Sequence, residues 1–165
     1  MKLIVRLILL AGLIAFAVWS WDFFFPTPKK VIENHLVKLA RLASFSSKDG
    51  EFKRLADTER IRSLLARNIH VVLDAPGGQG QTFDNREELL QAAMAARSSV
   101  KDLQAQFTDI GIIVNADQQS AVALLTVKAK IGGEPDWFIE RLKFTFKNTN
   151  DEWLITGLET VKALR

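Results

Sequence analysis

The acidic residue with the clearest chemical potential stands in an apolar, alternating segment near the C-terminus. Across residues 137–147, Glu140 falls on the same side as Phe138, Leu142 and Phe144, because successive side chains of a strand point to opposite faces. A carboxylate among apolar neighbours needs a partner or acquires a raised pKa. We therefore predict a pocket that includes these four residues, with two readings of Glu140: a group facing a ligand, or a residue with a structural partner or an edge position.

A histidine and a second carboxylate occur together in an earlier β-branched segment. In the strand predicted over residues 68–75, His70 and Asp74 fall on one side, with Cα atoms about 13 Å apart. At that separation they cannot contact each other, and acid–base work would require both to face a cavity, within about 3 Å of a substrate proton. Both are pocket candidates. No residue is assigned as catalytic, and His35 is interpreted as a packing or capping histidine.

The opposite side of the C-terminal strands is rich in basic residues. This face includes Trp137 and Ile139 and the basic residues Lys128, Lys130, Arg141, Lys143 and Lys147. It could be a solvated surface, a contact for anionic lipid headgroups, or an interface for a second copy or an acidic envelope protein. With a net charge of only +3 and few interleaved aromatic residues, nucleic acid is not expected as a partner.

Composition excludes several kinds of chemistry. The 165 residues contain no cysteine, which rules out a disulfide framework, a cysteine-ligated metal and a thiol nucleophile. Residues 76–81 are rich in glycine but lack the lysine and the serine or threonine of a phosphate-binding loop, so they are predicted to form a turn without a ligand. No metal and no cofactor are predicted.

The N-terminus carries an uncharged apolar run over residues 7–21, with Trp19 and Trp21 at its far end. Such a run with interfacial aromatic residues predicts a membrane anchor, although a cleavable signal peptide and a buried core helix are alternative interpretations. We expect residues 1–27 to form a transmembrane helix and hinge, and residues 28–165 to form the domain. The expected location is a bacterial inner membrane, with the domain extracytoplasmic.

The periodicity of the remaining chain predicts helices first and strands afterwards. Apolar residues recur at helical spacing over residues 28–45 and 52–65, and again after Asn85, which has capping-box spacing to Glu88. A two-residue period follows in four segments: residues 100–115, 120–131, 137–147 and 153–163. This order predicts an α+β domain with its helices on one face of a curved antiparallel sheet.

Two segments carry a resemblance to a known superfamily. The helix start Phe83-Asp84-Asn85-Arg86-Glu87-Glu88-Leu89-Leu90 and the closing strand Asp151-Glu152-Trp153-Leu154-Ile155-Thr156-Gly157-Leu158 are similar to the nuclear transport factor 2-like (SnoaL-like) superfamily. The resemblance covers residues 30–165. It implies a curved sheet that wraps the helices into a cone, a mouth able to hold a small apolar ligand, and dimerisation through the sheet.

The resemblance does not by itself imply an activity, because the superfamily contains enzymes and binding proteins. The branches that resemble ketosteroid isomerase and scytalone dehydratase rely on tyrosine, and this chain has none. Membrane-tethered members include assembly components of secretion systems. We therefore predict a membrane-tethered, extracytoplasmic module that binds a ligand or a protein without evident catalysis. The alternative is an isomerase- or dehydratase-like enzyme using Glu140, Asp74 or His70 on a small hydrophobic substrate.

Overall fold

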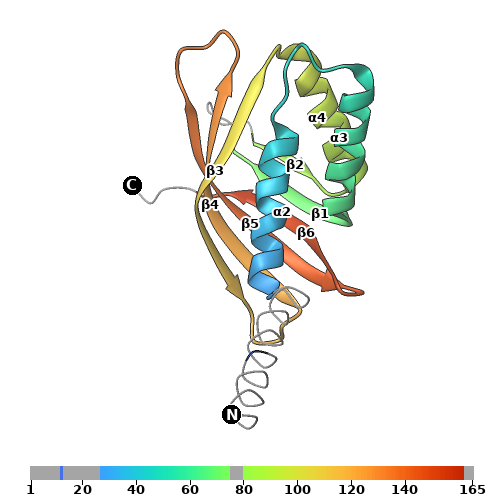
Figure 1. Ribbon diagram of the computed structural model, residues 1–165, viewed down its shortest axis with the longest axis vertical. Coiled ribbons are helices and arrows are strands. Elements are labelled where there is room, and N and C mark those ends of the chain that lie inside the picture. Colours follow the sequence, from blue (N-terminus) through green and yellow to red (C-terminus); the bar gives the residue numbers. More distant parts are fainter. Residues whose placement is uncertain (1–11, 13–26, 75–79, 162–165) are drawn as a thin grey trace, which may run out of the picture.

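The chain folds into three helices on one side of a six-stranded sheet, as the computed structural model shows for residues 12, 27–74 and 80–161 (Figure 1). The helices are α2 (Pro28–Ala43), α3 (Glu51–Leu64) and α4 (Arg86–Ser99). The strands are β1 (Leu65–Leu73), β2 (Gln81–Phe83), β3 (Leu103–Val114), β4 (Ser120–Ile131), β5 (Phe138–Thr149) and β6 (Glu152–Thr160), in the order β2-β1-β6-β5-β4-β3. The predicted α+β class is confirmed.

The last four strands form the predicted antiparallel meander. Neighbouring strands from β3 to β6 pair antiparallel in sequence order. The β5–β6 hairpin closes through Asn150 and Asp151, whose φ angles are 53° and 64°. Two consecutive residues with positive φ match the right-handed twist of a hairpin, and asparagine and aspartate tolerate this conformation well.

The prediction of a purely antiparallel sheet was wrong at one edge. Strand β1 pairs with β6 in parallel, with Val71 opposite Leu158, and the short β2 adds antiparallel to β1. A parallel pair between such distant segments leaves no hairpin signal in the sequence. Strand β2 was not predicted because three residues are too few to establish an alternating pattern.

A side-chain cap fixes the start of α4, whereas α2 and α3 start without one. The Asn85 side chain accepts a hydrogen bond of 2.9 Å from the backbone N–H of Glu88, so the predicted start of α4 is confirmed. Helix α2 starts at Pro28 and ends at Ala43, two residues before the predicted end. Its last turn is tied to the sheet by Ser44, whose hydroxyl donates to the carbonyl of Ala40 at 2.9 Å and accepts from the Ala105 N–H at 2.9 Å.

The sheet bends around α2, and a bulge in β3 contributes to the bend. The register against β4 shifts between Thr108 and Gly111, and the intervening Asp109 has a φ of 53°. An extra residue in one strand of an antiparallel pair increases local twist and bends the sheet. The concave side therefore faces the helices (Figure 1).

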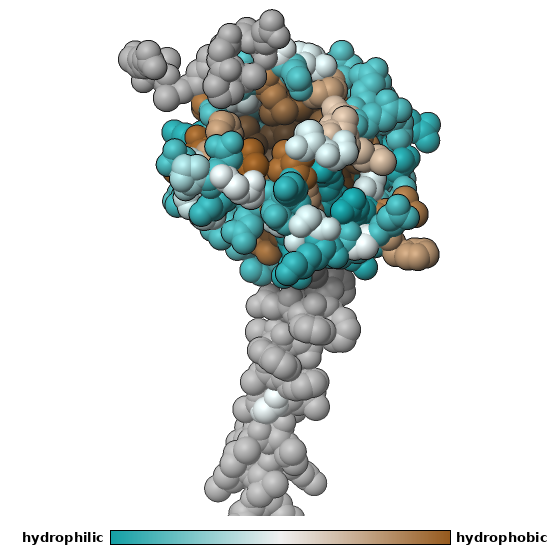
Figure 2. All heavy atoms as spheres, turned by 90° about the horizontal axis from the view of Figure 1, so that it is seen from above, coloured by the Kyte–Doolittle hydropathy of each residue, from teal (hydrophilic) through white to brown (hydrophobic). Residues whose placement is uncertain are grey.

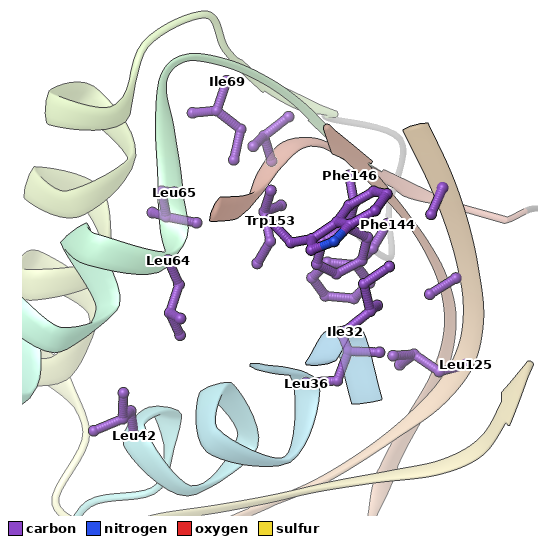
Figure 3. Packing of buried hydrophobic residues seen from close by; sticks show 14 of the residues in the cluster. Ile32, Leu36, Leu42, Leu64, Leu65, Ile69, Leu125, Phe144, Phe146 and Trp153 are labelled. Carbon is purple, nitrogen blue, oxygen red and sulfur yellow. The ribbon is translucent and has the colours of Figure 1, made fainter. Parts of the chain in front are cut away.

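The packed core fills the part of this concave side that α2 covers. Ile32 and Leu36 of α2 are fully buried and lie close to the aromatic side chains of Phe144, Phe146 and Trp153 (Figure 3). The Phe144 and Phe146 rings stack with centroids 6.4 Å apart. These large side chains close one half of the cone to solvent.

The predicted membrane anchor over residues 7–21 lies outside the described residues. Within the described ranges, no helix has both the length and the apolar character needed to cross a bilayer.

We expect replacement of Phe146 by alanine to lower the free energy of unfolding by about 3–5 kcal/mol, because it removes a ring from a site with 0% exposure. Phe52 provides a matched control, since its side chain is 92% exposed and Phe52→Ala should leave stability nearly unchanged. Urea denaturation followed by tryptophan fluorescence measures both. Equal effects of the two substitutions would contradict the location of the core.

Candidate functional site

An apolar cavity of about 480 Å³ lies between the helices and the concave face of the sheet. The space-filling view shows hydrophobic residues gathered in a hollow with a mainly polar rim (Figure 2). The sheet contributes Leu65, Ile69, Leu103, Phe107, Ile131, Leu142, Phe144, Ile155 and Leu158. The helices and their adjoining segments contribute Leu39, Ala43, Phe45, Thr58, Ile61, Leu89, Leu90, Ala93, Met94, Ala96, Arg97 and Val100.

The helical wall of the cavity combines small side chains with large apolar ones. Ala93 and Ala96 of α4 and Ala43 of α2 line it, facing a sheet that carries Phe107 and Phe144. Protein interiors are normally packed as densely as organic crystals, with few voids larger than one water molecule. A hollow of about 480 Å³ is far larger than such a void, and it opens to solvent, since Ala93, Met94 and Ala96 of its lining are exposed.

Two polar side chains, Thr58 and Arg97, occur among the lining residues. The Arg97 Nη2 atom donates to the carbonyl oxygen of Leu42 at 3.4 Å, at the C-terminal end of α2. Its guanidinium carbon also lies 4.8 Å from the centroid of the Phe45 ring, which is a cation–π distance. Among the described residues that form the wall there is no carboxylate and no histidine.

Two of the four pocket residues predicted on β5 line the cavity, and the other two lie in the β4–β5 hairpin outside it. Leu142 and Phe144 line the cavity. Glu140 and Phe138 share their face, opposite Val127 and Ala129 of β4, but they do not line it. Phe138 is 45% exposed, because the β4–β5 hairpin extends beyond the upper end of α2 (Figure 1). Glu140 is half-buried there, so its apolar neighbours do not enclose it.

The structure does not bring His70 and Asp74 into the cavity either. Ile69 and Val71 are buried, so the side chain of His70 points to the other face of β1. Its Nδ1 atom lies 2.6 Å from an Asp84 carboxylate oxygen, and both side chains are largely exposed. The backbone N–H of Asp74 donates to the Thr160 hydroxyl at 3.2 Å. The three candidate acid–base residues, Glu140, His70 and Asp74, thus share no common cavity.

The basic residues predicted for the outer sheet face lie on one side of β4 and β5, but they are staggered. In the ladder Arg141 is opposite Thr126, Lys128 is opposite Ile139, and Lys143 is opposite Leu124. Lys143 forms an ion pair with Glu159 of β6, and the Lys130 ammonium lies 5.9 Å from the Trp137 ring centroid. Lys147 is opposite Ser120. The face mixes charge with exposed aliphatic groups, and its partner stays a prediction.

Sequence reasoning missed Arg97 as a wall residue of the cavity. The helical spacing after Asn85 comes from the apolar residues Leu89, Leu90, Ala93, Met94 and Ala96, and it does not include Arg97. The signal was nevertheless present, because Arg97 stands four residues after Ala93 and therefore lies on the same side of the helix. An arginine that follows small apolar residues on one side of a helix indicates that the apolar surface formed by these residues ends at a positive charge.

Comparison with known proteins supports the fold and leaves the function open. No family model matches the sequence, and no curated protein matches it. Solved structures do match. A nuclear transport factor 2-like protein of unknown function from Pseudomonas putida KT2440 has a TM-score of 0.63 at 9% identity, over 81% of this chain and 85% of that one. The Kfla4162 protein from Kribbella flavida has a TM-score of 0.65 at 13% identity, over 84% and 92%.

A candidate scytalone dehydratase from Novosphingobium aromaticivorans DSM 12444 matches with a TM-score of 0.60 at 13% identity, over 82% of this chain and 84% of that one. Similarity at this level of identity establishes the fold alone. The domain has the nuclear transport factor 2-like fold, also described as cystatin-like among the matching structures. The sequence resemblance implies a curved sheet with the helices on one side, and this architecture is therefore confirmed.

His35 of α2 has an unusual electrostatic environment. It is half-buried, and its Nδ1 atom is buried without a hydrogen-bond partner among the described residues. Burial lowers the pKa of His35 below its ordinary value of 6.5, because the charged form loses hydration; the Trp153 backbone opposes this shift. His35 is therefore a packing residue that is costly to protonate.

The lowered pKa of His35 predicts a loss of stability in mild acid. The unfolded chain takes up the proton first, so this contribution is complete above about pH 6.5 and declines as the pH falls from there through the folded-state pKa. His35→Gln should flatten that decline in urea denaturation curves measured between pH 7.5 and 5.5. The exposed His70→Gln serves as the control and should retain it. An unchanged decline in His35→Gln would contradict the assignment.

Proposed function

We propose that this domain binds a small hydrophobic molecule inside its cone, and that its N-terminal segment tethers it to a membrane. The observation that carries the binding proposal is the apolar cavity of about 480 Å³. Small-molecule sites in proteins typically have volumes of about 300–1,000 Å³ and are lined mostly by apolar side chains with a few polar groups. The cavity agrees with both properties.

Burial of apolar surface supplies the driving force for such binding. Each methylene group that moves from water into an apolar site contributes about 0.8 kcal/mol. The lining residues within the described part of the chain offer no carboxylate, and the polar side chains Thr58 and Arg97 supply a few hydrogen-bonding groups for orientation. A mainly hydrocarbon ligand therefore suits this wall better than a sugar or a nucleotide.

Binding without turnover is the better-supported reading of the site. The alternative function is an isomerase- or dehydratase-like enzyme, and one of the similar structures is a candidate scytalone dehydratase. That chemistry requires an acid or base within about 3 Å of the substrate proton. The wall residues include neither Glu140, His70 nor Asp74, and the chain has no tyrosine.

The binding proposal is tested with Nile red, an uncharged dye whose fluorescence rises in apolar surroundings. We expect the dye to bind the wild-type domain and to bind Ala93→Phe about tenfold more weakly. The added ring occupies part of the cavity, and a tenfold weaker affinity corresponds to about 1.4 kcal/mol of binding free energy. Fluorescence titration measures both affinities.

Ala95→Phe is the matched control for this experiment. Ala95 is an exposed residue of the same helix and lines neither the cavity nor the neighbouring groove between α3 and α4. It should therefore bind the dye as the wild type does. Absence of binding to the wild type, or equal weakening by both substitutions, would refute the proposal.

The tether rests on the uncharged run over residues 7–21 and on its aromatic far end. We propose a single-pass protein of a bacterial inner membrane with an extracytoplasmic domain. Helix α2 starts at the lower end of the domain in Figure 1, whereas the hollow is seen from the upper end in Figure 2. A domain held at Pro28 would thus present its hollow at the end away from the attachment point.

Expression of the full chain with a C-terminal tag in a bacterial host tests the tether. The tagged protein should sediment with membranes, resist extraction by high salt, dissolve in mild detergent, and become protease-sensitive when only the outer membrane is opened. Mass spectrometry distinguishes an intact anchor from a cleaved signal peptide. A full-length, unprocessed chain in the soluble fraction would contradict the proposal.

A further inference from the structure

Arg97 stands where the apolar cavity meets a second, more polar groove. This groove, of about 530 Å³, lies between α3 and α4. Arg97 lines both the cavity and the groove, as do Phe45, Thr58, Met94 and Val100. A ligand in the cavity can therefore extend one end past Arg97 into the groove.

The groove carries an excess of positive charge. Its basic residues are Arg54, Arg62, Arg97 and Lys101, and its acidic residues are Glu51 and Glu59. Arg62 is neutralised by Glu59 at 3.4 Å and by Glu87 at 2.9 Å. Within the described part of the chain, Arg54, Arg97 and Lys101 form no ion pair with a carboxylate. The lining of the groove therefore carries a net positive charge, although Asp49 and Asp102 act electrostatically on Arg54 and Lys101.

The guanidinium of Arg97 retains most of its hydrogen-bonding capacity. Its Nη2 atom makes one long hydrogen bond of 3.4 Å to the Leu42 carbonyl, and its plane is steadied by the Phe45 ring. A guanidinium has five N–H donors in a planar fork that matches the two oxygens of a carboxylate. Because Arg97 is half-buried, a carboxylate there would be less screened by water than at the open surface.

We infer that the ligand is an anionic amphiphile: a single-chain carboxylate whose hydrocarbon tail fills the cavity and whose carboxylate binds Arg97. This inference rests on the proposed binding function and adds the chemical class of the ligand. A purely apolar ligand would leave the Arg97 guanidinium without a counter-charge, whereas a ligand with a carboxylate supplies one. The apolar wall of the cavity and the cationic Arg97 at its end together match a molecule with one hydrocarbon end and one negatively charged end.

The test compares dodecanoate with dodecanol, which has the same chain and no charge, by displacement of Nile red from the domain. We expect Arg97→Gln to bind dodecanoate about tenfold more weakly than the wild type, because a hydrogen bond to a charged group contributes about 1.5–3 kcal/mol and partial exposure reduces it. Dodecanol should bind both proteins equally. Decanoate, shorter by two methylenes, should bind the wild type about 15-fold more weakly than dodecanoate.

Two variants make the result specific to the position and geometry of the charge. Arg67→Gln removes an exposed arginine of β1 that lines neither the cavity nor the groove, and it should bind dodecanoate as the wild type does. Arg97→Lys keeps the charge without the planar fork and should give an intermediate affinity.

Equal weakening of dodecanoate and dodecanol in Arg97→Gln would overturn the inference, because the residue would then act only on the structure of the wall. Unchanged dodecanoate binding would overturn it as well, since the carboxylate would lie elsewhere. Both results leave the proposed binding function intact if the wild type binds Nile red. Failure of the wild type to bind Nile red and dodecanol refutes the binding function itself.

Discussion

The packing of α2 against the bent sheet determines both the core and the cavity. Ile32 and Leu36 reach the aromatic side chains of β5 and β6 and close one half of the concave face. The same helix ends at Ala43, and its end is fixed to β3 through Ser44. Beyond this point α3 and α4 cover the sheet, with contacts to β1 and β6, and the cavity lies between these helices and the sheet. The hollow is therefore bounded by all three helices, since Leu39 and Ala43 of α2 also line it.

This arrangement gives the two halves of the cone different electrostatics. Beside the packed core, partial burial lowers the pKa of His35, so its half-buried ring is costly to protonate. In the hollow half, Arg97 keeps its charge at the boundary with solvent and is held by a carbonyl and an aromatic ring, both of which tolerate a cation.

Sequence patterns predicted the parts of the structure that depend on local geometry. Alternation assigned Leu142 and Phe144 to the inner face of β5, and the asparagine at position 85 marked the start of α4. Alternation gives the face of a strand, but it does not say how far along the strand the helices extend. Glu140 shares the face of Leu142 and still falls outside the cavity for this reason. The parallel pairing of β1 with β6 also depends on tertiary contacts that leave no local signal.

The position of the hollow bears on how a hydrophobic ligand would enter and leave. Leu55 and Met94 are exposed apolar residues that line the groove next to Arg97, so the entrance is not uniformly polar. Exposed apolar groups beside an apolar cavity shorten the path over which a hydrocarbon chain must contact water. If the domain is held at the start of α2, this entrance lies at the far end from the attachment point. Exchange would then occur with a partner or a surface away from the tether, and the exposed side chains of α3 and α4 are the ones that such a partner would meet.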